Sequence, residues 1–315
     1  MATNDQLNLG NAPLVVTKGG TGLSSTTANQ LLYSSATSTI AGLSTAASSV
    51  LITNSGSVPS MSGALTNGQV IIGSTGATPT AATLTAGTGI SVTNGAASIT
   101  LATTAFTQVN MQVFTASGTY TPTSGMKYCI IECVGSGGGG GGSQGGVAQS
   151  AAGAGGGAGG YARIVATAAT IGASQAVTVG AVGAGGAAGN NNGSAGSATS
   201  LGTICVAGGG GGGNGAASSA SIVPTQAGDG GIGTTGTILA RGNAGTRGYG
   251  FGSSTVAVGG QGGSSHFQGT RLTSANNDGT AGGAYGAGGG GGSSLTVDHA
   301  GGDGGAGIVI VTEYI

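Results

Sequence analysis

Glycine makes up one third of the residues from 135 to 315, 60 of 181, and it occurs in runs broken by short apolar stretches. Each glycine inside an α-helix costs about 1 kcal/mol, which disfavours a helical bundle. The whole chain has only five prolines, too few for a collagen repeat. Such a sequence is expected to fold from strands, turns and extended glycine segments.

The chain carries few charges: six Lys or Arg, seven Asp or Glu, and a formal net charge of −1. Binding to nucleic-acid phosphates needs a basic surface, so no nucleic-acid partner is expected. Hydrophobic residues make up 38% of the chain, which argues against disorder. The sequence has no apolar stretch of about 18 residues and no secretory signal at its start, so we expect no membrane insertion.

Residues that carry chemistry are sparse and unpaired. Cys129, Cys133 and Cys205 lack the spacing of metal ligands, and we interpret them as small buried hydrophobes. The adjacent Asp298 and His299 have no evident third partner for nucleophilic catalysis. The spacing of the aspartates in this part of the chain matches no calcium-binding loop. We therefore expect no enzymatic activity, no catalytic residue, no metal and no cofactor.

The first part of the chain contains a weak repeat that starts at residues 31, 50 and 70. Each repeat indicates one short strand and a turn, and Gly89–Leu101 indicates a hairpin whose turn is Asn94-Gly95. One such unit buries too little apolar surface to be stable alone. We therefore predict that residues 1–110 form an elongated, intertwined β shaft, in which three chains share one narrow core.

The second part, residues 111–315, is predicted to be a β-sandwich-like body interrupted by glycine-rich excursions. The last strand, 307–315, is apolar on both faces and is placed centrally in a sheet. The fold class is thus all-β throughout. The expected strands of this part lie at 113–114, 118–122, 128–134, 161–165, 176–179, 201–206 and 307–315.

The glycine runs have two interpretations, flexible linkers or ordered polyglycine II helices. Such helices are extended, have three residues per turn and make no internal hydrogen bonds, so they must bond to one another. The runs lie between strands that a compact domain must hold together, and this favours the ordered bundle. Pure glycine at 137–142, 208–213 and 288–292 suits the interior of a bundle. The mixed sequences at 153–160 and 228–233 suit its exterior.

Four motifs, in this order, resemble those of phage tail-fibre and receptor-binding adhesin proteins. Lys18–Leu23 and Leu84–Gly95 are similar to motifs of fibre shafts. Phe114–Pro122, which precedes a strand and a glycine run, and the closing Gly307–Val311 resemble the glycine-rich tail-fibre domain. The resemblance covers nearly the whole chain, and similar fibre modules occur in other contractile injection systems and in predatory bacteria.

The resemblance implies a homotrimeric shaft and a distal domain of packed polyglycine helices that display recognition loops. Loops of such adhesins bind an outer-membrane protein or a surface glycan of a bacterial cell. The implied location is extracellular, in a virion tail fibre or the equivalent fibre of a related contractile system or predatory bacterium. A more proximal fibre or a baseplate protein is the implied attachment partner. No long docking segment is present, so we expect a fragment or a short distal fibre.

Large side chains are so rare in the glycine-rich part that their positions indicate where recognition takes place. Tyr and Arg in loops are typical binding anchors. A second candidate is the loop 214–227, and the structural alternative is that the aromatic residues close the bundle edges while Arg247 and Arg271 cap carbonyls. The candidate receptor-binding residues are Arg241, Arg247, Tyr249, Phe251, His266, Phe267, Arg271, Tyr285 and His299.

Other functions compete with the adhesin interpretation. A structural coat or wall protein with no specific ligand would not need the varied side chains at 237–281. An ice-binding protein needs a flat, regular face of Ala or Thr, and a glycan depolymerase needs paired carboxylates. Neither pattern is found in the sequence. Two questions stay open: whether the chain only assists assembly of another tip, and whether residues 135–315 form three separate heads or one shared head.

Overall fold

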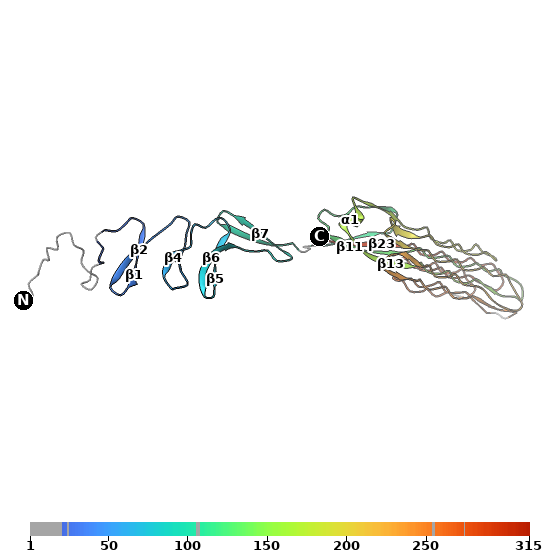
Figure 1. The fold of residues 1–315 in the computed structure, drawn as a ribbon. Coiled ribbons are helices and arrows are strands. Elements are labelled where there is room, and N and C mark those ends of the chain that lie inside the picture. Colours follow the sequence, from blue (N-terminus) through green and yellow to red (C-terminus); the bar gives the residue numbers. More distant parts are fainter. Residues whose placement is uncertain (1–20, 24, 105–107, 254–255, 274) are drawn as a thin grey trace, which may run out of the picture. The chain divides into compact units, whose positions relative to one another are not determined.

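The computed structural model describes residues 21–23, 25–104, 108–253, 256–273 and 275–315 (Figure 1). It divides into two compact units, Met1–Ala105 and Phe106–Ile315, which are treated separately. The fold is all-β, as predicted, and the helix found among the described residues is the four-residue α1, Ala168–Ile171. In the described part of the chain, no helix is long and apolar enough to span a membrane. The first three residues of the Lys18–Leu23 motif lie outside the described residues.

The first unit consists of β-hairpins. Each repeat is a complete hairpin, so the expectation of one strand per repeat was wrong. Tight turns with positive φ at Ser38 (60°) and Gly76 (75°) reverse the chain within two residues and leave room for a second strand. The pairs are β1 (Gln30–Ala36) with β2 (Thr39–Ser44), β3 (Leu51–Thr53) with β4 (Pro59–Met61), β5 (Gln69–Ser74) with β6 (Ala77–Thr83), and β7 (Ile90–Gly95) with β8 (Ser98–Thr103).

The last of these hairpins forms where it was predicted, but its turn lies two residues later. Asn94 and Gly95 belong to β7, and the turn is Ala96-Ala97, with φ of 55° at Ala97. This register lengthens the hairpin and places Val92 directly opposite Leu101. A direct cross-strand apolar pair stabilises a hairpin, which explains why the Asn94-Gly95 turn signal is overridden.

No described residue of the first unit is fully buried. Successive hairpins do contact one another, and the Ser55 N–H donates to Thr78 Oγ1 at 3.2 Å. Even so, Leu51 and Leu101 remain 51% and 60% exposed. Isolated two-stranded hairpins are at best marginally stable in water. The described part of this unit therefore has no hydrophobic core of its own.

The second unit contains a β-sandwich with two five-stranded antiparallel sheets. Their inner faces enclose a core that includes Tyr120, Ile131, Leu201 and Val309, all fully buried. The first sheet has the order β19 (Ile238–Ala240), β13 (Tyr161–Thr167), β11 (Tyr128–Val134), β23 (Ile308–Tyr314), β9 (Val109–Phe114). The second has the order β10 (Gly118–Tyr120), β14 (Gln175–Thr178), β15 (Thr199–Leu201), β16 (Cys205–Ala207), β18 (Gly233–Thr235).

Most expected strands are present. The closing strand β23 lies between β11 and β9, as predicted from its two apolar faces. The three cysteines are free and buried, also as predicted. The single strand expected at 201–206 is instead a β15–β16 hairpin, because Gly202 adopts a φ of 51° and reverses the chain.

Glu313 is the one charged residue that is fully buried among the described residues. Its carboxylate accepts hydrogen bonds from the Tyr120 hydroxyl (2.8 Å), the Thr123 N–H (2.9 Å) and the Thr123 hydroxyl (2.6 Å). The side-chain amides of Asn110 and Gln112 donate to it as well, at 2.9 and 3.3 Å. Burial raises the pKa of this carboxyl, but these bonds outweigh burial, so the pKa is lowered overall.

The glycine runs form an ordered bundle, which decides against flexible linkers. The segments extend from the sandwich to a common end, here called the far end (Figure 1). In segment 135–143, every third residue donates to the same neighbour: Gly135, Gly138 and Gly141 donate to 154–160. The other two rows donate to 191–197 and 299–305. A three-residue period without internal bonds is the geometry of polyglycine II.

The bundle has a hexagonal arrangement. Two central segments, 135–143 and 153–160, each exchange backbone hydrogen bonds with six neighbours, including one another. A Cβ built on Gly140 would lie 2.0 Å from the carbonyl oxygen of Gly290, so the spacing tolerates only glycine there. The segments of the bundle are 135–143, 153–160, 180–187, 191–198, 208–216, 226–232, 241–248, 259–264, 278–283, 286–292 and 299–307.

Segment 153–160 was expected on the exterior because it contains alanine, and this was wrong: all eight residues are buried. Its alanines fit where a neighbouring segment ends. A Cβ built on Gly157 would lie 2.0 Å from the carbonyl oxygen of Asp229 in segment 226–232. Because the segments repeat every three residues, Ala154 faces residue 226, the first residue of that segment. By the same period, Ala158 lies opposite residue 264, the last residue of segment 259–264. The runs 208–213 and 288–292 contact both central segments, in line with their glycine content.

Candidate functional site

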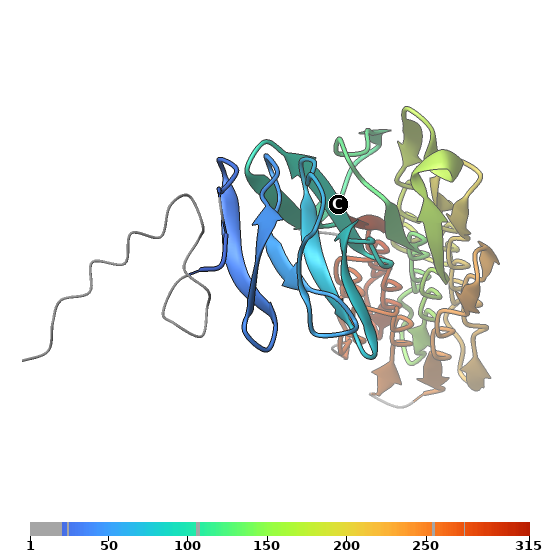
Figure 2. The same cartoon turned by 60° about the vertical axis from the view of Figure 1, so that its left-hand side comes forward.

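The two ends of the bundle differ in what they carry. At one end the segments continue into strands of the sandwich, as at Val134–Gly135 and Gly307–Ile308. At the far end they are joined by loops that contain very short strands (Figure 2). The described residues of these loops are 144–152, 188–190, 217–225, 249–253, 256–258 and 293–298. The bundle itself presents few side chains, so the far end is where varied side chains are brought together.

A three-stranded sheet lies at the far end, with the order β17 (Ile222–Pro224), β20 (Tyr249–Phe251), β21 (Ala257–Val258). In its middle row Gly250 and Ala257 are buried against the bundle, and a Cβ on Gly250 would lie 2.7 Å from the Ser150 carbonyl oxygen, whereas Val223 at the edge of this row is 42% exposed. The two outer rows are exposed. The register pairs Ile222 with Phe251, and Tyr249 with both Pro224 and Val258.

The exposed face of this sheet is apolar and aromatic. Tyr249 and Phe251 are 40% and 42% exposed, and their ring centroids lie 6.4 Å apart. Val147 and Val297 from neighbouring loops are exposed as well. The only nearby cation of the candidate set is Arg247, at the end of segment 241–248. We call this set the far-end surface; it consists of Val147, Ile222, Pro224, Tyr249, Phe251, Val258 and Val297.

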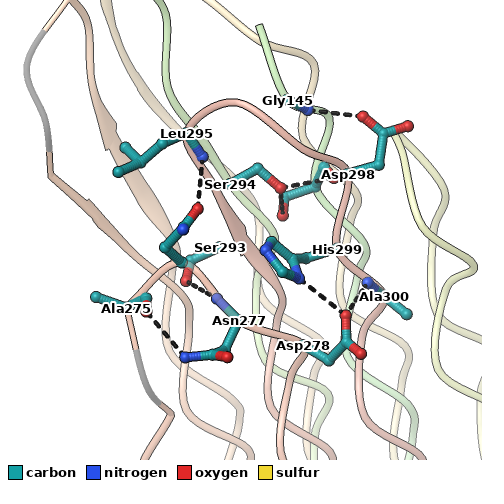
Figure 3. Close-up of polar contacts among 12 residues, drawn as sticks. Gly145, Ala275, Asn277, Asp278, Ser293, Ser294, Leu295, Asp298, His299 and Ala300 are labelled. Carbon is teal, nitrogen blue, oxygen red and sulfur yellow. Dashed lines mark hydrogen bonds and ion pairs between the residues drawn. The ribbon is translucent and has the colours of Figure 1, made fainter.

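Polar contacts fasten the loops behind this surface. The hydroxyl groups of Ser143 and Ser294 lie 2.6 Å apart, and the Ser294 hydroxyl donates to the Ser143 carbonyl at 2.9 Å. The Ser150 hydroxyl donates to the Gly252 carbonyl at 3.0 Å. Asp298 accepts the Gly145 N–H at 2.8 Å (Figure 3). The loops are therefore held in one arrangement instead of being free at their ends.

His299 pairs with an aspartate distant in sequence and not with its neighbour Asp298. Its Nδ1 lies 3.0 Å from Asp278 Oδ1, which also accepts the Ala300 N–H at 2.9 Å (Figure 3). The Ala300 N–H and then His299 lower the pKa of Asp278 below its ordinary value. His299 Nε2 is buried and has no hydrogen-bond partner in the described part of the chain. The pair joins segment 278–283 to segment 299–307.

The lowered pKa of Asp278 predicts an acid-dependent contribution to stability. A carboxylate whose folded-state pKa is depressed stabilises the fold above its unfolded pKa, here near 3.8, and that stability is lost as the pH falls through the folded value. Asp278→Asn should therefore lower the thermal midpoint at pH 7 by a small amount, because the group is exposed, and the difference should shrink as the pH falls below 3.8. Thermal unfolding at pH 7 and through the acid range tests this, and a difference that stays constant as the pH falls would contradict it.

The model of the glycine-rich domain family matches residues 112–314. The chain belongs to this family. No curated protein matches the chain in sequence. In this glycine-rich domain, the matched region begins in β9 and ends in β23, so it contains the sandwich strands, the bundle and the far-end surface.

Several candidate residues lie at the opposite end of the glycine-rich domain, beside the sandwich. The ring of His266 stacks on Tyr161 with centroids 3.9 Å apart, and Phe267 packs edge-on against Tyr161. Arg241 Nε donates to the Gly230 carbonyl at 3.1 Å, and the Tyr285 carbonyl accepts from the Ser265 hydroxyl. A hollow of about 280 Å³ lies here, lined in part by Tyr161, Arg241, Asn243, Ser264, Ser265 and His266.

The structure thus divides the candidate residues into groups. It brings Tyr249, Phe251 and Arg247 to the far end, with His299 in the loop attachment behind them. Arg241, His266, Phe267 and Tyr285 lie beside the sandwich, and Arg271 lies in the connection between segments 259–264 and 278–283. Phe267 packs against Tyr161 of β13, and among the described residues the arginine whose side chain donates to a carbonyl is Arg241, and not Arg247 or Arg271 as in the structural alternative.

Sequence reasoning missed the exposed valines of the far-end surface. Val147 is 92% exposed, in the loop between the two central segments. Its position in the sequence could have identified it, because it is a single branched apolar residue immediately after a glycine run, where the chain must turn. Val258 and Val297 occupy similar places near the ends of segments. The loop 214–227, the second candidate, does contribute Ile222 and Pro224.

Proposed function

We propose that this glycine-rich protein is a tail-fibre-type adhesin that recognises a receptor on a bacterial cell, an outer-membrane protein or a surface glycan. The observation that carries the proposal is the exposed apolar and aromatic face of β17–β20–β21 at the far end of the bundle. Exposed apolar patches on ordered surfaces mark interaction sites. Tyrosine and other aromatic residues give large contact area at low entropic cost.

The construction of the bundle supports this role. Its segments bond through backbone groups, and side chains of the loops add hydrogen bonds to neighbouring backbone, so the far-end loops are held in place on a rigid scaffold. Binding residues are commonly carried by loops on a rigid scaffold. Preorganised loops lose little conformational entropy when a partner binds, which increases affinity.

The proposal includes assembly as a homotrimer, located in a virion tail fibre or in the equivalent fibre of a related contractile system or predatory bacterium. The absence of any fully buried residue among the described residues of the first unit supports assembly, because such hairpins need further chains to form a core. A more proximal fibre or a baseplate protein is the proposed attachment partner.

Binding of fluorescently labelled protein to a panel of bacterial strains tests the proposal. The double variant Tyr249→Ala/Phe251→Ala should lose binding by about 100-fold or more, since aromatic anchors contribute roughly 2 kcal/mol each. The matched control is Leu272→Ala, which removes a side chain that is 76% exposed but lies outside the far-end surface. This control should bind like the wild type.

Thermal unfolding should show that both variants are folded. Equal loss in the double variant and the control, or undiminished binding by the double variant, would contradict recognition through the far-end surface. If the wild type binds no strain, the alternative of a structural fibre or assembly protein without a specific ligand becomes the better explanation.

A further inference from the structure

The edge strand β9 has an inverted polarity pattern. Its polar residues Asn110 and Gln112 point into the sandwich, where they donate to the buried Glu313. Its apolar residues Val109, Met111 and Val113 point outward and are 54%, 61% and 52% exposed. An antiparallel sheet with one solvated face normally alternates apolar inward and polar outward. The hydrogen bonds to Glu313 fix this orientation, so the outward apolar row is a determined feature of the fold.

The apolar row continues across the neighbouring strands. The register places Val109, Met111 and Val113 beside Tyr314, Thr312 and Ile310 of β23. The next strands add outward side chains of Tyr128, Ile130 and Val165, and the rings of Tyr128 and Tyr314 stack at 4.6 Å. Val165 is 58% exposed. We call this surface of the first sheet the outer face; it consists of Val109, Met111, Val113, Tyr128, Ile130, Val165, Ile310, Thr312 and Tyr314.

The part of the same sheet nearest the bundle is already covered. Val134, Tyr161 and Ile308 point to the same side and form a small buried cluster, against which Ile310 packs. Phe267 and His266 pack on Tyr161 at this place. One end of this side of the sheet is thus a core, whereas Val109, Met111, Val113 and Val165 of the outer face stay more than half exposed among the described residues of the second unit.

The chemistry of the outer face favours an apolar protein partner. The charged residues next to it are Glu132 and Arg163, which are direct cross-strand partners and cancel one another. Nucleic acids and anionic membranes require a surplus of cations. A burying partner must instead supply apolar side chains.

The chain itself indicates which partner this is. The first unit ends at Ala105 and β9 begins at Val109, four residues later, a reach of at most about 14 Å. If copies are joined through their first units, each β9 is tethered within this reach of its own joined unit. A short tether raises the effective concentration to about the millimolar range, which favours a second copy over a protein in free solution.

We propose that the outer face, centred on Met111, packs against the outer face of further copies of this chain, so that the glycine-rich domains form one shared head. This inference rests on the homotrimeric assembly in the proposed function. It implies that the far-end surfaces of the copies are held in a fixed relation and bind a receptor together.

Cysteine accessibility in the full chain tests the inference. All three native cysteines are buried, so a single new cysteine is the main reactive thiol. The test variant is Met111→Cys, and the control is Val147→Cys at the 92% exposed far-end position. Each is treated with a maleimide dye and with a short bismaleimide cross-linker, and its mass is measured by light scattering.

The expected result is that Met111→Cys reacts with the dye at least about tenfold more slowly than Val147→Cys, and that the cross-linker joins chains only in Met111→Cys. A trimeric mass with fast labelling at 111 would overturn the shared head and leave the trimeric shaft in place. Slow labelling without cross-linking would overturn it in favour of a cover from the chain's own first unit. A monomeric mass would overturn both the shared head and the assembly on which it rests.

Discussion

Replacing Gly140 by alanine is expected to abolish or nearly abolish folding of the glycine-rich domain. The new methyl carbon would lie 2.0 Å from the carbonyl oxygen and 2.4 Å from the carbonyl carbon of Gly290. No flexible side chain is available to move away, because the obstacle is backbone that is itself bonded to further segments. Relief requires separation of whole segments, with the loss of their hydrogen bonds. We expect a loss above about 4 kcal/mol, which is exceptional for a single substitution.

Gly269→Ala is the matched control, because an added Cβ at this exposed position meets nothing within 4 Å. It should leave stability unchanged or raise it by about 0.5 kcal/mol through the unfolded state. The measurement is the soluble yield and thermal midpoint of each variant. A Gly140→Ala protein that unfolds within about 2 °C of the wild type would show that the segments are not in the close contact described.

Glu313→Ala is expected to have the second-largest effect, a loss of about 3–5 kcal/mol. The substitution removes the acceptor shared by the Tyr120 hydroxyl, the Thr123 N–H and the side-chain amide groups of two β9 residues. The side-chain link from the closing strand to Tyr120 and Thr123 is lost, whereas β9 keeps its backbone pairing with β23. Denaturant unfolding at pH 7 measures the loss.

The conservative variant Glu313→Gln distinguishes the contribution of the negative charge to stability from that of the side-chain shape. It keeps one carbonyl oxygen but sets an NH2 group against the donors of the site, so an intermediate loss of about 1–3 kcal/mol is expected at pH 7. Because the folded-state pKa of Glu313 is lowered, its contribution is present above the unfolded pKa and disappears as the pH falls through the folded value. The wild type should therefore lose more stability in acid than the Gln variant does. Equal acid sensitivity of the two proteins would contradict an ionised Glu313.

Sequence reasoning predicted much of the architecture, because the relevant signals are local. Alternation and apolar runs located β11 and β23, and glycine runs between strands indicated an ordered bundle. The position of each segment within the bundle was less accessible. Segment 153–160 is central although it contains two alanines, because tolerance for a methyl group depends on where the neighbouring segments end. That information is not present in the segment's own sequence.

The candidate site was only partly predictable for a similar reason. Counting rare large side chains identified Tyr249 and Phe251, but the same count selected His266 and Phe267 at the other end of the bundle. Consecutive segments run in opposite directions, except 259–264 and 278–283, so residues less than 20 positions apart can emerge at opposite ends. To assign a residue to one end of the bundle, one must know how many times the chain reverses direction before it. The connection at 265–277 contains one reversal that its sequence does not reveal.

The backbone-bonded bundle has a consequence for how such a protein can change. In most domains a loop is anchored by side chains that pack in a shared core, so a new loop sequence disturbs its support. Here the segments below the loops are joined to one another by peptide groups, which are the same whatever the neighbouring loop contains. Each far-end loop begins and ends at a segment whose position in the bundle is fixed. An insertion, deletion or substitution confined to a far-end loop therefore leaves the hydrogen bonds of the bundle beneath it unchanged.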